Sequence, residues 1–242
     1  MAKTIALLGA LDTKGAEYAF VKECIEARGL KTLLVDVGVL DPPFVTPDVS
    51  RAEVAKAGGG DIEQLAAARD RGEAVAVMAR GAAALLPKLC AEGKFDGIIA
   101  MGGTGGTSVA CSAMRALPLG VPKVMVSTLG GGDVSAYTGT KDITFMPSIV
   151  DVAGINSISR AIYRNAAGAI AGMVHMEAPT VAGQRPLLAA SMFGNTTICV
   201  DRARSELENA GYEVLVFHAT GTGGKTMESL IADGYIVGSL DI

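Results

Sequence analysis

The 242-residue chain contains no tryptophan, 5% aromatic residues and a net charge of −4. It has no basic run and no basic patch interleaved with aromatic residues, so the electrostatic footprint of nucleic-acid binding is missing. No apolar run approaches the roughly 18–20 residues of a membrane span. The N-terminus begins a strand rather than a signal peptide, because Asp12 and Lys14 interrupt its apolar stretch. We therefore expect neither nucleic acid nor membrane as a partner.

Metal and covalent chemistry also lack their usual signals. The four cysteines are far apart and form no C-x-x-C pair, which predicts free thiols in a reducing, cytoplasmic setting and no metal site. No G-x-S-x-G elbow or H-E-x-x-H motif occurs, so no covalent or metal-hydrolase mechanism can be read.

Apolar residues make up 50% of the chain, which also contains 31 glycines. This composition is typical of α/β proteins with parallel sheets. The chain opens with strand Thr4–Gly9, helix Ala16–Arg28 and strand Lys31–Val37, a βαβ unit. A polar hinge at Pro179–Arg185 precedes a second run of strand, loop and helix that begins at Leu187.

The sequence thus predicts two Rossmann-like domains with parallel sheets, residues 1–180 and 185–242. The second domain has three expected strands, which are few for a doubly wound sheet covered on both faces. We expect it to be a C-terminally truncated piece of a longer protein, and a small complete subdomain is the alternative.

The stretch Phe95–Thr107, FDGIIAMGGTGGT, is the strongest site signal. A buried strand runs into a glycine-rich turn and an expected helix at Ser108–Ala116, an order that typically builds an anion site. Glycines allow close backbone approach to a ligand, and hydroxyls add donors. The alternative is a tight turn that binds nothing. The candidate phosphate-binding residues are Gly102, Gly103, Thr104, Gly105, Gly106 and Thr107.

Loops after other strands add candidates, because carboxyl ends of parallel strands share one edge of a sheet. After the first strand, Thr13 and Lys14 could hold a phosphate, or Asp12 or Thr13 could cap the next helix. Asp36 ends the second strand, where an acid can meet a ribose hydroxyl, or it is a turn residue.

Two more glycine loops follow later strands. Gly130, Gly131 and Gly132 are expected to border the same crevice, and nearby Asp133 or Asp151 could hold Mg²⁺. The third loop contains Gly221 and Gly223. Neither the dinucleotide fingerprint nor the P-loop spacing is present in any of these loops.

Long segments of the chain resemble one family. IALLGALDTKGAEYAFVKECI, DGIIAMGGTGGTSVA, VSTLGGGDVSAYTGTKDITFMPSIVDVAGIN and VFHATGTGGKTMESLI are similar to the Tm-one-like family. This uncharacterised family is named for the ATP-binding half of the tomato mosaic virus replication inhibitor. The resemblance implies a two-domain α/β fold, an ATP site built from the glycine loops, a homodimer, and members longer than this chain. Carried over residue by residue, it implies ligand contacts from Asp12, Thr13 and Lys14, from the 102–107 loop and from the 130–133 loop, with the 221–224 loop as a further contributor. It implies no reaction.

We therefore expect an ATP-binding protein of unassigned activity, with phosphates held by the glycine loops at the inter-domain cleft and Mg²⁺ as a candidate companion ion. The alternative is an ATP-dependent ligase or kinase that acts on a small carboxylated or phosphorylated metabolite. A third reading is a scaffold that uses ATP only to set its conformation.

Overall fold

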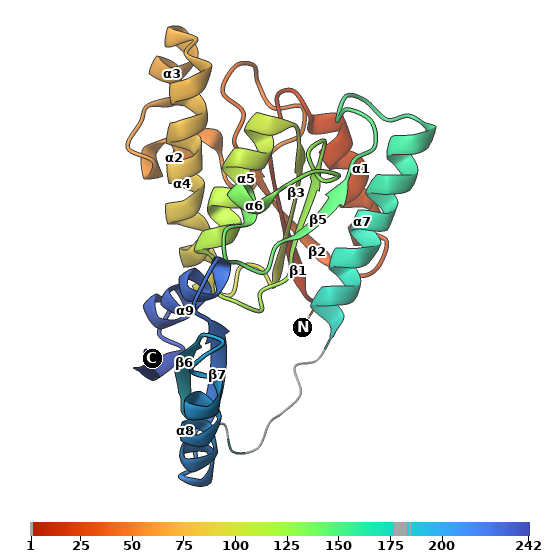
Figure 1. Ribbon diagram of the computed structural model, residues 1–242. Coiled ribbons are helices and arrows are strands. Elements are labelled where there is room, and N and C mark those ends of the chain that lie inside the picture. The colour runs from red at the N-terminus through yellow and green to blue at the C-terminus, as the bar shows by residue number, and fades with distance from the viewer. Residues whose placement is uncertain (1, 177–182, 184) are drawn as a thin grey trace. The chain divides into compact units, whose positions relative to one another are not determined.

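The computed structural model describes residues 2–176, 183 and 185–242. The chain divides into two compact units, Met1–Glu177 and Ala178–Ile242 (Figure 1). Both are α/β units with parallel sheets, which confirms the predicted fold class. Most of the predicted hinge at Pro179–Arg185 lies outside the described residues.

The first unit is built on a five-stranded sheet of order β2-β1-β3-β4-β5. The chain runs from β1 outward to β2, then crosses back to β3 and continues the other way, so the strand order reverses between β1 and β3. Ligands of such sheets bind in the crevice at this switch point, beyond the carboxyl ends of the strands. The strands are β1 Thr4–Gly9, β2 Lys31–Asp36, β3 Gly97–Gly102, β4 Lys123–Ser127 and β5 Thr144–Pro147.

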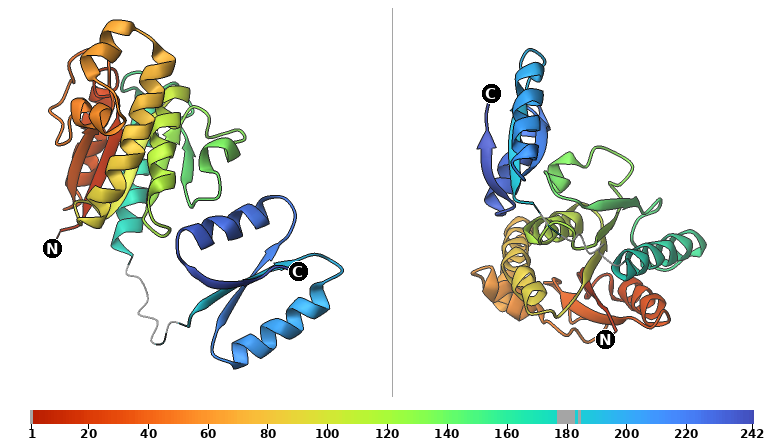
Figure 2. Two further views of the ribbon diagram at one scale, coloured as in Figure 1. Left: turned by 90° about the vertical axis from the view of Figure 1, so that its left-hand side faces the viewer. Right: turned by 90° about the horizontal axis from the view of Figure 1, so that it is seen from below.

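Helices cover both faces of this sheet, which is why its strands are apolar throughout. Figures 1 and 2 show α1 and α7 on one face and α4 and α5 on the other. The core accordingly has two clusters, one on each face of the sheet. The helices are α1 Gly15–Glu26, α2 Arg51–Ala57, α3 Ile62–Ala68, α4 Arg71–Ala91, α5 Thr104–Ala116, α6 Ser135–Thr138 and α7 Ser157–His175.

Two helix starts differ from the sequence prediction. Helix α5 begins at Thr104 rather than Ser108, with Gly103 as its N-cap, so the glycines form its first turn. Helix α2 was not predicted, although Ser50 and Glu53 form a capping box at its start, a signal that the sequence does contain.

The 21-residue helix α4 is long and apolar enough to cross a membrane by length and composition alone. Its buried residues, including Val77, Met78, Ala82 and Leu86, belong to the core cluster that also contains residues of α5. Packing in this core accounts for part of its apolar composition, since 39% of its most apolar 18-residue window is buried.

The second unit contains a three-stranded parallel sheet of order β7-β6-β8, with α8 and α9 on opposite sides (Figure 2). Its buried cluster is small and comprises Leu188, Ala190, Val200 and Val214. The elements are β6 Leu187–Met192, α8 Thr197–Asn209, β7 Glu213–His218, α9 Thr222–Ala232 and β8 Ile236–Leu240.

Candidate functional site

A buried tyrosine holds β1 and β3 at the point where they part. Pairing between these strands ends at Leu8 and Ala100. The Tyr18 hydroxyl then donates to the Leu8 carbonyl at 2.6 Å and accepts the Met101 N–H at 2.7 Å. Its ring needs glycine at position 9, because a Cβ there would lie 2.0 Å from the Tyr18 ring. Tyr18 therefore satisfies the backbone groups that separate at the switch point.

A cavity of about 1430 Å³ lies beyond this point. Its walls are the loops that follow all five strands of the first unit, together with parts of α3, α4 and α5. Every lining residue lies between Ala10 and Asp151, so the first unit forms the cavity by itself, whereas the sequence predicted a site in a cleft between domains.

The first turn of α5 forms part of the wall. The Thr107 N–H bonds back to the Gly103 carbonyl at 2.8 Å, which closes the first helical turn. The N–H groups of Thr104, Gly105 and Gly106 precede that bond and have no acceptor within residues 2–176. These three donors and the positive end of the helix dipole make this wall attractive to an anion.

The fold itself does not require glycine at three of these positions. None of them has a positive φ. A Cβ would meet nothing closer than 3.7 Å at Gly103, 3.6 Å at Gly105 and 3.7 Å at Gly106. Glycine in a helix costs about 0.5–1 kcal/mol relative to alanine, so packing within the fold gives no reason for glycine at Gly105 and Gly106, which lie inside α5. Only Gly102 is tight, with a Cβ 3.1 Å from the Gly106 Cα.

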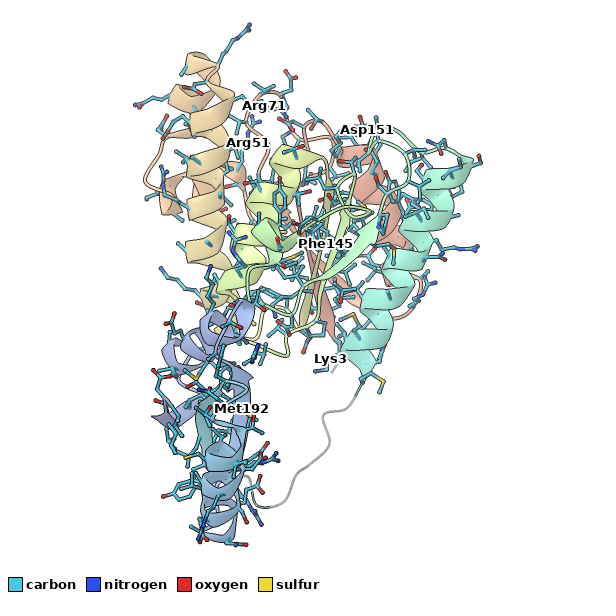
Figure 3. The ribbon with its side chains drawn as sticks, in the orientation of Figure 1. Lys3, Arg51, Arg71, Phe145, Asp151 and Met192 are labelled. Carbon is cyan, nitrogen blue, oxygen red and sulfur yellow. The ribbon has the colours of Figure 1, made fainter. Side chains whose placement is uncertain are left out.

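Three cations line the same cavity: Lys14, Arg69 and Arg71. A Cβ on Gly105 would lie 3.6 Å from Nη2 of Arg71, so this guanidinium flanks the α5 N-terminus. Within residues 2–176 none of the three cations forms an ion pair or a side-chain hydrogen bond. Figure 3 shows Arg71 at the carboxyl end of the sheet, where α4 begins. Their charges are therefore available to a bound anion.

The predicted loop after β1 lies at the cavity, and each of its residues has a different role. The Asp12 carboxylate accepts the Val39 and Leu40 N–H groups at 3.1 and 3.0 Å, which ties down the loop after β2. Thr13 is exposed, and Lys14 is the N-cap of α1 without a side-chain cap bond. The alternative of Asp12 or Thr13 as the N-cap is therefore wrong.

Asp36 and Thr107 do not act as predicted, because both are fully buried and neither lines the cavity. Asp36 accepts the Leu11 and Gly38 N–H groups at 3.0 and 2.8 Å. Burial raises the pKa of Asp36, and these N–H groups partly offset the rise. The Thr107 hydroxyl bonds Ser127 at 2.8 Å. Both side chains join loops together and have no surface for a ribose or a phosphate.

The loop after β4 contributes one of its three predicted glycines. Gly131 lines the cavity, and a Cβ there would meet nothing within 4 Å. Gly130 is needed for packing, since its Cβ would lie 2.9 Å from the Pro147 nitrogen. Gly132 is exposed, and it does not line the cavity.

In the second unit, local structure accounts for Gly221 and Gly223. Gly221 has a φ of 74° as the N-cap of α9, a conformation that favours glycine. A Cβ on Gly223 would lie 2.1 Å from the His218 carbonyl oxygen. The predicted ligand role of these two glycines therefore has no structural sign in its favour.

The cavity also has an apolar end between α3, α4 and α5. Leu65, Val75, Met78 and Val109 line it there. This wall could take the flat, apolar face of a ligand whose charged part lies at the α5 N-terminus.

Of the two acids considered for Mg²⁺, only Asp151 lines the cavity. Asp133 is exposed and accepts the Ser135 N–H at 2.9 Å. The described part of the chain contains no group of three or more His, Cys, Asp or Glu side chains placed to hold a metal. A divalent cation here would depend on oxygens of the ligand for most of its coordination.

Sequence reasoning missed Arg69, Arg71 and Ile149. The available signal was the position of the two arginines on either side of Asp70. Ile149 has a φ of 64°, and no local sequence pattern predicts a positive φ at this position.

Relatives cover the chain closely. A UPF0261 protein of Clostridium tetani is 53% identical over 242 residues, which are all of this chain and 60% of that protein. A UPF0261 protein of Rhizobium meliloti is 45% identical over 99% of this chain and 59% of its own length. The chain thus spans about 60% of the length of these relatives.

The tomato protein described as ToMV susceptible protein tm-1(GCR26) is 44% identical over 177 residues, which cover 71% of this chain and 24% of that protein. This relationship confirms the resemblance to the Tm-one-like family.

Among solved structures, UDP-N-acetylglucosamine 2-epimerase from Rickettsia bellii aligns at 11% identity with a TM-score of 0.37, over 98% of this chain and 68% of that one. MurG from Acinetobacter baumannii aligns at 13% identity with a TM-score of 0.33, over 99% of this chain and 66% of its own. The N-terminal domain of the uncharacterised protein family UPF0261 matches residues 3–179 and its C-terminal domain matches residues 185–242, so the chain belongs to this family.

Proposed function

We propose that this chain binds ATP in the cavity of its first unit, with the phosphates at the N-terminus of α5. The observation that carries the proposal is the use of Gly103, Gly105 and Gly106 where the fold accepts a Cβ. A phosphate chain needs close approach to backbone N–H groups, and only glycine leaves room for it.

The surroundings of this turn fit a nucleotide. Arg71 flanks it, and Lys14 and Arg69 line the same cavity. These three cations suit a polyanion better than a single carboxylate. The apolar end at Val75 and Met78 suits a base.

An ATP-dependent enzyme is the second candidate function. The observation that favours it is the cavity volume of about 1430 Å³. Pockets for one small ligand usually measure about 300–1,000 Å³, so a second substrate has room beside the nucleotide. Release of ADP or AMP in the presence of candidate substrates would distinguish this function from binding alone.

A thermal melt of the full chain with and without ATP and Mg²⁺ tests the binding proposal. A ligand at 100 times its Kd should add about 2.7 kcal/mol to the native state. Inorganic phosphate at the same concentration separates nucleotide binding from capture of any anion. Equal melting temperatures with and without ATP would contradict the proposal, and an equal rise with phosphate would contradict its nucleotide part.

A further inference from the structure

The loop after β2 forms one wall of the cavity, and its N–H groups are already paired. Residues 37–41 all line the cavity. The first N–H of the loop donates to the carbonyl at the end of β1 at 2.9 Å, and the Gly38 N–H donates to the Asp36 carboxylate at 2.8 Å. The next two N–H groups both donate to the Asp12 carboxylate, at 3.1 and 3.0 Å. A ligand in the cavity therefore meets no free N–H group on residues 37–40.

The carbonyl groups of the same loop are unpaired. Among the residues that the structure describes, no group donates a hydrogen bond to the carbonyls of Val37, Gly38 and Val39. This includes Lys14 and Arg69, the two cations that line the same cavity. A carbonyl that a ligand covers without a donor costs free energy. A ligand that covers this wall must therefore bring N–H or O–H groups of its own.

Apolar side chains surround these carbonyls. Val37 belongs to the core cluster that contains Leu65 of α3 and Met78 of α4, and Val39 packs against that cluster. Leu65 and Met78 also line the apolar end of the cavity. A flat ring can lie against such side chains while its edge meets the carbonyls. The wall thus suits the edge of a base that carries a hydrogen-bond donor, and it disfavours a phosphate or carboxylate, whose oxygens are acceptors.

We propose that the carbonyls of residues 37–39 bind the exocyclic amino group of an aminopurine and so select adenine as the base of the bound nucleotide. The inference rests on the proposed ATP site and deepens it, since it names the groups that recognise the base. A base with an oxygen in place of the amino group would set an acceptor against acceptors. Asp12 and Asp36 act as positioning residues, because their carboxylates keep the N–H groups of the loop occupied.

Adenosine and purine riboside, which is adenosine without its amino group, test the proposal on the full chain. Their dissociation constants would be measured by ligand-observed NMR titration. Loss of one hydrogen bond to a covered carbonyl is worth about tenfold in affinity, so adenosine should bind at least about tenfold more tightly than purine riboside. Equal affinities of the two nucleosides would overturn the proposal.

Variants at Asp12 test how the selectivity arises. Asp12→Ala frees two N–H groups of the loop, so it should remove most of the preference for adenosine, whereas Asp12→Asn keeps an oxygen acceptor and should restore that preference. A merely structural role would weaken both nucleosides alike, and an unchanged preference in Asp12→Ala would overturn the role assigned to Asp12. Asp48→Ala is the matched control and should leave the preference unchanged, because this exposed carboxylate accepts the Leu34 N–H at 2.8 Å outside the cavity lining.

The nucleosides carry no phosphate, so failure of the base contact is distinguishable from failure of the phosphate site. If ATP and purine riboside triphosphate bind equally well, and both bind more tightly than their nucleosides, the nucleotide proposal stands and the base contact is refuted. If adenosine shows the expected preference and ATP binds no more tightly than adenosine, the base contact stands and the phosphate site fails. Binding of none of the four compounds would overturn both.

Discussion

Replacing Gly105 with alanine should stabilise the free protein. The residue is the second of α5, its φ is not positive, and a Cβ would sit at van der Waals distance, 3.6 Å from Arg71 and 3.7 Å from Val75. Alanine in a helix is worth about 0.5–1 kcal/mol over glycine. For a unit of this size that corresponds to a rise of about 1–4 °C in Tm.

The same methyl group should weaken ATP binding, because it occupies the space into which a phosphate oxygen would approach. At an ATP concentration of 100 times the wild-type Kd, bound ATP adds about 2.7 kcal/mol to the wild type. A hundredfold loss of affinity would leave only about 0.4 kcal/mol. The variant should therefore melt above the wild type without ATP and below it with ATP.

Gly172→Ala is the matched control. Gly172 is an exposed glycine inside α7, and a Cβ there would meet nothing within 4 Å. It should give a similar rise in Tm and keep the full response to ATP. Calorimetric melts of the three proteins with and without ATP decide the matter. A Gly105→Ala protein that melts lower without ligand, or that keeps the wild-type ATP shift, would refute the reasoning.

Three further predictions concern other parts of the first unit and one exposed thiol. Asp142→Ala should destabilise the protein by about 1–3 kcal/mol in urea unfolding, because it removes the carboxylate that lies 2.7 Å from the fully buried Lys123 ammonium. Asp142→Asn should lower the free energy of unfolding by less. Equal losses in the two variants would show that the charge of Asp142 plays no part. Arg71→Ala should weaken ATP binding by about tenfold and reduce its salt dependence in titrations at two ionic strengths; an unchanged salt dependence would exclude Arg71 from the anion site. Burial raises the pKa of the Cys111 thiol to about 11, whereas Cys199 is exposed. Cys199 should therefore react with iodoacetamide before Cys111 does, which mass analysis of the peptides would show. Labelling of Cys111 before Cys199 would contradict the structure.

Local signals in the sequence were sufficient for strands β1, β2 and β3 and for the loops that follow them. Strand Gly97–Gly102 is bounded by turn residues, and the glycines that follow it mark the helix start within a few residues. Thr107 could not be judged in this way. Its burial depends on Ser127, 20 residues later, and one step along the first turn separates a residue that faces the cavity from one that faces the core.

The position of Arg71 at the cavity could not be predicted from the local sequence, for a related reason. Arg71 flanks the α5 N-terminus only because α4 packs along α5, an arrangement set by the apolar faces of both helices. The residue itself carries no sign of that packing, since arginine at a helix start is ordinary on a protein surface. Proximity created by helix packing is a tertiary property, and it is visible only when both helices are in place.

The glycine loops show most clearly what a structure adds to a motif. In sequence, GTGGT at 103–107 and GTGGK at 221–225 look equivalent. In the structure, Gly223 is fixed by a Cβ clash at 2.1 Å, whereas Gly105 and Gly106 meet no such constraint. A glycine that the fold requires says nothing about a ligand, because the turn needs that glycine whether or not a ligand binds. A glycine that lowers stability and relieves no clash must be explained from outside the fold. Gly105 and Gly106 are such glycines, they lie inside a helix, and they line a cavity together with Arg71, which is why the proposed anion site is centred on the first loop.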